Sequence, residues 1–153
     1  MMTKQKIKLI SHRGNVNGQN IERENTLSYI DEANFLGYDV EIDVWMSNGY
    51  LYLGHDCAKT RIDYSCLVDR QDFLWIHCKN FQALSFLSSF CDLKTFFHEN
   101  ERYTYISNGV IWAHDISDID NNCIIPLLEE KQILDWTKQN VYGICSDYVE
   151  LFK

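Results

Sequence analysis

Residues 6–46 read KIKLISHRGNVNGQNIERENTLSYIDEANFLGYDVEIDVWM, and this stretch decides the fold class. Residues 6–11 alternate between polar and apolar side chains, which predicts a first strand. Residues 25–36 place apolar side chains on one helical face and stop at Gly37, which predicts a helix. Residues 38–46 predict a second strand. Strand, helix and strand in this order form the βαβ unit of a parallel α/β sheet.

The rest of the chain continues as short elements. Residues 47–49 predict a tight turn, after which residues 50–54 return as a short strand. We expect further strands at 73–79, 94–98, 103–107, 109–113, 123–128 and 143–146, and further helices at 62–73, 81–91 and 131–139. The short runs at 103–107 and 109–113 leave no room for a helix between them, so the second half of the chain is compressed.

Length and charge limit the classes of protein that are possible. The 153 residues contain no repeat and no linker, so we expect residues 1–153 to form a single domain. A net charge of -8 argues against a general nucleic-acid binder and against docking on anionic lipid. It does not argue against a phosphate substrate, because a bound cation can reverse the sign of charge inside a small site.

The hydropathy and cysteine patterns suggest a cytoplasmic protein. No apolar run is long enough for a transmembrane segment, and the charged N-terminal residues lack the apolar core of a signal peptide. The six cysteines contain no Cys-x-x-Cys pair. We therefore expect reduced, mostly buried thiols, and a zinc site built from them is disfavoured.

Residues 10–56 carry side chains suited to cleaving a phosphodiester. The motifs are Ser-His-Arg-Gly at 11–14, Glu-Asn-Thr at 24–26, Glu-Ile-Asp at 41–43 and Gly-His-Asp at 54–56. Histidines can transfer protons, and an arginine can bind phosphate. The sequence therefore places acid–base groups and an anion-binding group in one short region.

The carboxylates of Glu41 and Asp43 are two residues apart on a predicted strand, so they point to the same side. Apolar residues occupy the opposite face. Two inward carboxylates repel one another unless a cation or a proton joins them. This pattern predicts a site for a hard divalent cation. His55 follows a short strand tied to the same strand by a turn, so it can fold back over the metal, although a packing role is the alternative.

These motifs resemble those of the glycerophosphodiester phosphodiesterases, members of the PLC-like phosphodiesterases. More distantly, they resemble the metal-dependent phospholipase D toxins and the phosphatidylinositol-specific phospholipases. The family pattern runs His-Arg-Gly, Glu-Asn-Thr at a helix start, Glu-x-Asp on the second strand and His-Asp, and all four are present here in order. Residues 143–148, Gly-Ile-Cys-Ser-Asp-Tyr, are similar to the family's Gly-x-x-Thr-Asp-Tyr-Pro ending.

The resemblance implies a TIM-barrel-like (β/α)8 fold of the α/β class. Because such barrels typically need ~250 residues, we expect a compact form with up to eight strands and with shortened or missing helices in the C-terminal half. It also implies a small phosphodiester substrate whose own hydroxyl attacks phosphorus. His12 and His55 would be the acid and the base, in an order that stays open.

The resemblance also implies a ligand set. Glu41 and Asp43 would hold Mg²⁺, Ca²⁺ or Mn²⁺, and Arg13 and Lys79 would stabilise charge on the phosphoryl group. The third strand departs from the family, which has Glu-x-Lys where this chain has His77-Cys78-Lys79. His77 is open to three interpretations, as a metal ligand better suited to manganese, iron or zinc, as a phosphate contact, or as the mark of a weakened metal site.

Other residues have two interpretations each. Glu99, on the following strand, is the candidate to replace the missing carboxylate ligand. Glu24 either begins the helix or faces the site, and we expect Glu24 and its neighbour Asn25 to support the site. Four late residues either line the substrate pocket or are structural, namely Trp112, His114, Asp115 and Asp147.

The sequence leaves two other functions open. One is a phosphate-ligand binding module or pseudoenzyme, which the loss of the third carboxylate supports and the retained pair of histidines opposes. The other is a lyase that stops at a cyclic phosphate. A phosphodiesterase is the function that the motifs favour.

Overall fold

The structure is a computed structural model that describes residues 6–136 and 140–153. In these residues the strands are β1 (Lys8–His12), β2 (Asp39–Ser47), β3 (Tyr50–Leu53), β4 (Thr60–Ile62), β5 (Leu74–Cys78), β6 (Lys94–Phe96), β7 (Tyr103–Tyr105), β8 (Ile111–Ala113), β9 (Cys123–Pro126) and β10 (Gly143–Ser146). The helices are α1 (Leu27–Phe35), α2 (Tyr64–Val68), α3 (Phe81–Leu87), α4 (Glu130–Leu134) and the 3-10 helix η1 (Val149–Phe152).

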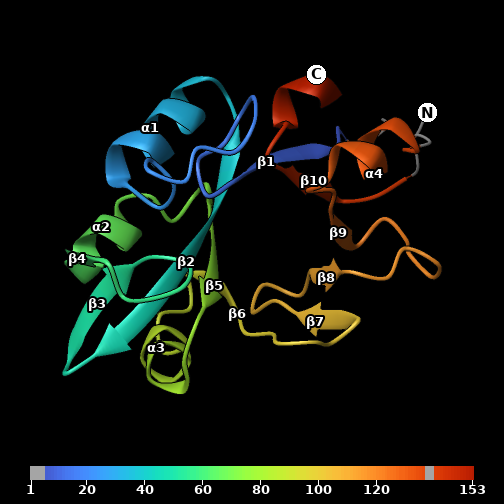
Figure 1. The fold of residues 1–153 in the computed structure, drawn as a ribbon. Coiled ribbons are helices and arrows are strands. Elements are labelled where there is room, and N and C mark those ends of the chain that lie inside the picture. Colours follow the sequence, from blue (N-terminus) through green and yellow to red (C-terminus); the bar gives the residue numbers. More distant parts are fainter. Residues whose placement is uncertain (1–5, 137–139) are drawn as a thin grey trace.

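All ten strands belong to one mixed sheet (Figure 1). Its parallel part runs β6-β5-β2-β1-β10-β9-β8. The β3–β4 hairpin extends the sheet antiparallel to β2, and β7 is antiparallel to β8. The predicted βαβ start is confirmed, because β1, α1 and β2 follow in order and β1 pairs parallel with β2.

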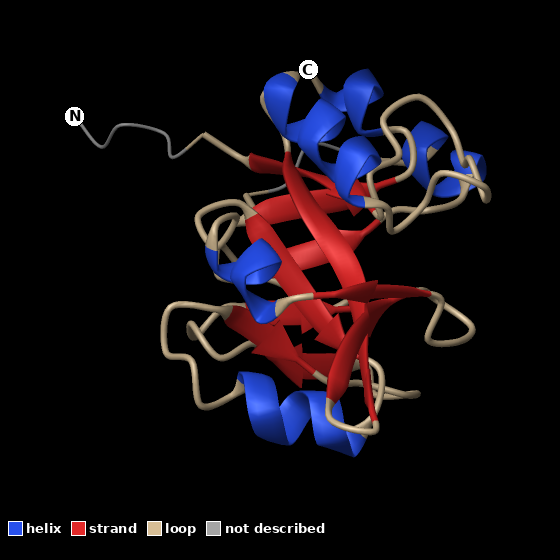
Figure 2. Cartoon of the chain, turned by 90° about the vertical axis from the view of Figure 1, so that its left-hand side faces the viewer, coloured by secondary structure: helices blue, strands red, loops and turns tan. Residues whose placement is uncertain are grey.

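The predicted (β/α)8 barrel is wrong. The sheet is a half-barrel of mixed direction with four short α-helices in the described residues (Figure 2). The reason lies in the connections between β6 and β9, which are residues 97–102, 106–110 and 114–122. A parallel crossover that includes its helix needs at least about 10–12 residues. The chain therefore turns back on itself at β7, and among the described residues the second half of the sheet has no covering helix before α4.

Two other predicted elements also differ. The helix expected at 62–73 is the end of β4 followed by the short α2, because Asp63 takes the extended conformation of an N-cap and divides the segment. The helix expected at 131–139 is α4, which ends at Leu134, and residues 137–139 lie outside the described residues. The helices expected at 25–36 and 81–91 are present in shorter form as α1 and α3.

The outer face of the sheet packs against the first three helices. Alternate residues of β2, including Val40, Ile42 and Val44, bury their side chains against α1, α2 and α3. Figure 1 shows these helices along the same side of β2 and β5. Because side chains alternate along a strand, the residues between them must point to the inner face. Glu41 and Asp43 are among those residues.

The inner, concave face is filled at its base by apolar side chains. Ile10, Trp75, Phe96 and Trp112 form the largest part of this cluster, and the rings of Phe96 and Trp112 stack with centroids 4.9 Å apart. Ser107, in the turn between β7 and β8, links this hairpin to the free edge of β6. The backbone N–H of Ser107 donates to the carbonyl of Thr95, and the backbone N–H of Thr95 donates to the hydroxyl of Ser107, both at 2.9 Å. This apolar base leaves the polar residues at the carboxyl ends of the parallel strands.

In the part of the chain that the structure describes, none of the helices combines the length and apolar character that crossing a membrane requires.

Candidate functional site

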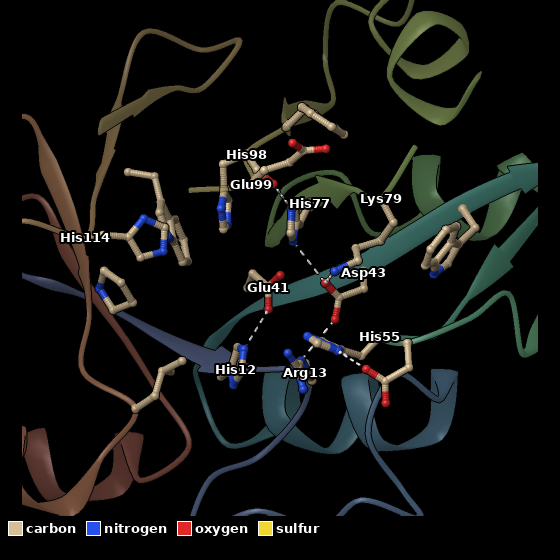
Figure 3. Close-up of a pocket in the computed structure, with 16 residues that line it drawn as sticks. His12, Arg13, Glu41, Asp43, His55, His77, Lys79, His98, Glu99 and His114 are labelled. Carbon is tan, nitrogen blue, oxygen red and sulfur yellow. Dashed lines mark hydrogen bonds and ion pairs between the residues drawn. The ribbon is translucent and has the colours of Figure 1, made fainter. Parts of the chain in front are cut away.

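The register of three parallel strands places the predicted site residues side by side. His12 at the end of β1 pairs with Glu41 on β2, and Asp43 on β2 pairs with His77 on β5. Lys79 follows directly after β5, and its backbone N–H donates to the carbonyl of Val44 at 2.8 Å. Figure 3 shows these side chains converging over the concave face.

His55 reaches the same place through the β2–β3 hairpin. The N–H of Arg13 donates to the carbonyl of Glu41 (2.8 Å), and the N–H of Gly54 donates to the carbonyl of Asp43 (3.2 Å). The ends of β1 and β3 therefore follow one another along the same edge of β2. Gly54 has φ 151°, and a Cβ there would lie 2.1 Å from the carbonyl oxygen of Cys57, so only glycine fits the turn that presents His55.

These residues line one cavity with a volume of about 590 Å³. Its lining includes every residue predicted to act in catalysis, phosphate binding or metal binding, namely His12, Arg13, Glu41, Asp43, His55, His77, Lys79 and Glu99. The structure thus gathers into one cavity residues that lie up to 87 positions apart in the chain (from 12 to 99).

Glu41, Asp43 and His77 form a group that can hold a cation. All three are buried, and each offers one ligand atom within 4.8 Å of the others. The Oε2 atom of Glu41 is buried without a hydrogen-bond partner. An orphaned carboxylate oxygen in such a place is costly unless a cation or proton satisfies it, so the residues fit a divalent metal.

Asp43 is surrounded by donors. Its Oδ2 accepts a hydrogen bond from Asn25 Nδ2 and lies against Arg13 Nε, both at 3.0 Å. Its Oδ1 is 3.1 Å from His77 Nδ1 and 3.9 Å from Lys79 Nζ. Although burial acts to raise the pKa of Asp43, the His77 hydrogen bond and the Arg13 charge hold it well below its ordinary value. We therefore expect Asp43 to be ionised near neutral pH.

Glu41 behaves in the opposite way. Burial, reinforced by the nearby charge of Asp43, raises the pKa of Glu41 from 4.5 to about 7. The pKa values of Glu41 and Asp43 are thus shifted in opposite directions, because Asp43 is surrounded by hydrogen-bond donors and Glu41 is not. A cation bound between them would compete with the proton on Glu41.

His12 is positioned by a buried carboxylate. Its Nδ1 lies 2.8 Å from Asp147 Oδ1, the same oxygen that accepts from Asn15 Nδ2 at 2.8 Å. With Nδ1 engaged, Nε2 is the ring nitrogen left for chemistry, and it lies 3.7 Å from Glu41 Oε2. Burial opposes protonation, but the hydrogen bond to Asp147 and the charge of Glu41 outweigh it, so the pKa of His12 is raised.

His55 is half-buried and also paired with a carboxylate, since its Nδ1 is 2.9 Å from Asp56 Oδ1. The indole N–H of Trp45 donates to the carbonyl of Gly54 at 2.7 Å and holds the preceding turn. Burial lowers the pKa of His55, and the positive charges of Arg13 and Lys79 add to that effect. The pKa values of the two histidines are therefore shifted in opposite directions, upward for His12 and downward for His55.

Arg13 and Asn25 have backbone φ angles of 59° and 55°, which non-glycine residues seldom adopt. They support each other, because the N–H of Asn25 donates to the carbonyl of Arg13 at 3.1 Å. Such conformations cluster at functional sites, where the surroundings hold them. They turn Arg13 toward Asp43 and let the side-chain oxygen of Asn25 accept from the N–H of Asp43 at 2.9 Å.

Glu24 faces the site. Its carboxylate accepts from Arg13 Nη1 (3.3 Å) and from Asn15 Nδ2 (2.9 Å). The N-cap of α1 is Thr26, and its side chain makes no capping hydrogen bond. Of the two interpretations that the sequence left open for Glu24, the contacts favour a supporting role in the site.

A row of histidine rings extends from the candidate metal group of Glu41, Asp43 and His77 toward the opposite wall. The rings of His77 and His98 stack with centroids 4.3 Å apart, and His98 meets His114 edge-on at 4.6 Å. Burial, together with the neighbouring His77 and His114, lowers the pKa of His98 to about 4. The sequence motifs did not single out His98, although it ends the strand predicted at 94–98. It lies just before Glu99, the candidate to replace the missing carboxylate ligand.

The remaining predicted residues have separate places. Glu99 lines the cavity but is exposed, and it lies outside the metal-type group found among the described residues. Trp112 and His114 line the cavity. Asp115 instead hydrogen-bonds Ser117 and lies 3.4 Å from Arg102 Nη1. Asn15, which connects Glu24 with Asp147, gave no signal in the sequence beyond its place after the His-Arg-Gly motif.

Comparisons with protein-family models, with curated proteins and with solved structures find no match for this chain. The site combines two histidines backed by carboxylates, a buried metal-type group and two cationic side chains in one cavity.

Proposed function

We propose that this chain is a metal-dependent phosphodiesterase that hydrolyses a small phosphodiester of the glycerophosphodiester type. One observation carries the proposal. His12 and His55, each paired through Nδ1 with a carboxylate, line the same cavity as the buried group of Glu41, Asp43 and His77. Binding a phosphate does not require two such histidines, whereas moving protons onto and off two ester oxygens does.

The cationic side chains would bind the phosphate. Arg13 and Lys79 both lie against Asp43 and line the cavity, so a phosphoryl group above them would share their charge. Glu41, Asp43 and His77 would hold a divalent metal, which when bound neutralises a phosphate oxygen and favours ionisation of a nearby hydroxyl. Glu24 and Asn25 keep Arg13 and Asp43 in place.

The two histidines would exchange protons with the substrate. A hydroxyl of the substrate attacks phosphorus, so that a new O–P bond forms and the ester bond to the leaving alcohol breaks. We assign His55, with its lowered pKa, as the group that takes the hydroxyl proton, and His12, with its raised pKa, as the donor to the leaving oxygen. Water then opens the cyclic phosphate with the two roles exchanged.

The test is a phosphorus NMR assay on glycerophosphodiesters, with magnesium, calcium and manganese supplied separately. We expect conversion to glycerol phosphate with at least one cation, and none in excess chelator or in Asp43→Asn. Failure of the wild type to cleave any phosphodiester with any of the three cations would overturn the proposal. We further propose a cytoplasmic location, since all six cysteines are free thiols.

A phosphate-ligand binding module is the second candidate. The observation in its favour is that Asp43 is already paired with Arg13, His77 and Asn25. Such a site could hold a phosphate on Arg13 and Lys79 without chemistry. In the same NMR samples, a bound phosphodiester that shifts its resonance but is not converted would favour this candidate. Accumulation of a cyclic phosphate would instead indicate a lyase.

A further inference from the structure

A second cavity opens beside the first, with a volume of about 540 Å³. The two cavities share Trp45 and Asp56 in their linings, so they lie next to one another at these residues. The second cavity is formed by the end of β2 and its turn, by the loop after His55 and by the start of α3. Its other lining residues are Met46, Ser47, Asn48, Cys57, Ala58, Asn80 and Gln82.

The lining of this second cavity mixes apolar side chains with exposed amide and hydroxyl groups, and among the described residues Asp56 is the charged side chain in it. Asn48, Gln82 and Ser47 are exposed, and their amide and hydroxyl groups both donate and accept hydrogen bonds. The amide of Asn80 is occupied by the backbone of Met46 and of Ala83. Hydroxyl groups match such a surface, because each one can accept from an amide N–H and donate to an amide oxygen.

An ionic group would fit less well. Among the described residues, no lysine or arginine lines this cavity, so an anion there would meet only the negative charge of Asp56. That carboxylate is also engaged with His55 Nδ1 at 2.9 Å, which reduces its attraction for a cation. In the part of the chain that the structure describes, Trp45 is the one aromatic side chain in the lining, whereas binding of a quaternary ammonium typically uses a cage of several.

We propose that the second cavity binds an uncharged, hydroxyl-rich ester arm of the substrate, such as a cyclic polyol or a sugar. The inference rests on the proposed phosphodiesterase function and adds a substrate class to it. A phosphodiester carries two ester arms. With the phosphate on Arg13 and Lys79 and the glycerol arm in the first cavity, the other arm extends past Trp45, whose ring is held by its bond to the Gly54 carbonyl.

The test uses the double variant Asn48→Gly, Gln82→Ala. Glycine keeps the turn, because Asn48 has a positive φ of 50° that glycine adopts readily, and Gln82 is exposed on α3. Neither residue contacts the proposed catalytic groups among the described bonds. Asn121→Ala, an exposed amide before β9, is the matched control.

Turnover is compared on glycerophosphoinositol, glycerophosphocholine and glycerol methyl phosphate. We expect kcat/KM of the double variant to fall about tenfold on the inositol substrate, as the loss of one or two hydrogen bonds implies. The value on the methyl substrate should stay unchanged, as should all three values in the control. An equal fall on all three substrates, or wild-type preference for the choline substrate, would overturn the assignment.

A binding measurement separates this inference from the proposed function. Calorimetric titration of glycerophosphoinositol in chelator, where turnover is blocked, should give about tenfold weaker binding for the double variant. A wild type that cleaves no phosphodiester refutes the function, while a binding difference in chelator still supports the polyol subsite. Identical binding by wild type and double variant refutes the subsite, whatever the turnover.

Discussion

Replacing Glu41 with glutamine should stabilise the metal-free protein above neutral pH. The carboxylate of Glu41 is 3% exposed, its Oε2 has no hydrogen-bond partner, and Asp43 lies beside it on the same strand face. These surroundings raise its pKa from 4.5 to about 7. The difference between the two pKa values corresponds to about 3 kcal/mol in the free energy of unfolding.

The sign follows from proton binding. The folded protein holds the Glu41 proton more tightly than the unfolded chain does, so protonation favours folding. This contribution is complete below pH 4.5 and is lost as the pH rises to about 7. The pKa of Asp43 is lowered, so its contribution is lost only as the pH falls below 3.8. Across the window from 4.5 to about 7, the stability of Glu41→Gln relative to wild type should therefore increase, by about 3 kcal/mol at most.

The assay is urea unfolding in chelator at a series of pH values across that window. Glu22→Gln, which alters an exposed carboxylate, is the control and should follow the wild type. Manganese should then stabilise the wild type, by about 2.7 kcal/mol when the free ion is at a hundred times its dissociation constant. It should stabilise the glutamine variant far less. Parallel pH curves for the wild type and Glu41→Gln, or equal stabilisation of both by manganese, would refute the reasoning.

Three further changes test the site. His12→Ala and His55→Ala should each lower turnover by about 100-fold or more; full activity in a variant with native circular dichroism would remove that histidine from the mechanism. Asp147→Asn should lower kcat about tenfold or more with little change in KM, and should move the His12 limb of the pH–rate profile to lower pH; an unmoved limb would assign Asp147 a structural role. His77→Glu should shift metal preference in thermal-shift titrations from manganese towards magnesium and calcium, and an unchanged preference would count against His77 as a ligand.

The sequence predicts local features of this fold well. The β1–α1–β2 unit could be predicted because its periodicity is contained in neighbouring residues. The shared face of Glu41 and Asp43 follows from the two-residue repeat of a strand. The turn that presents His55 is also local, since it depends on Gly54 and on pairing between adjacent strands.

Long-range features could not be predicted in the same way. Whether the sheet closes into a barrel depends on how residues 97–122 connect distant strands, and short apolar runs there do not specify strand direction. The pairing of His12 with Asp147 joins residues 135 positions apart. The C-terminal motif drew attention to Asp147, but only the pairing of β1 with β10 shows which side chain it contacts.

The hydrogen bond between His77 and Asp43 links protons to the proposed metal site. Asp43 is held ionised, so the proton in the bond to His77 belongs to Nδ1 of the imidazole. A metal ligand needs a lone pair, so a cation bound through Nδ1 of His77 would require the proton to leave that nitrogen, and a cation bound by Glu41 would compete with the Glu41 proton. The site therefore has two alternative ways to balance its buried carboxylates. In one, protons and the Arg13 charge balance them; in the other, which is the proposed metal-bound form, a divalent cation would take the place of the protons.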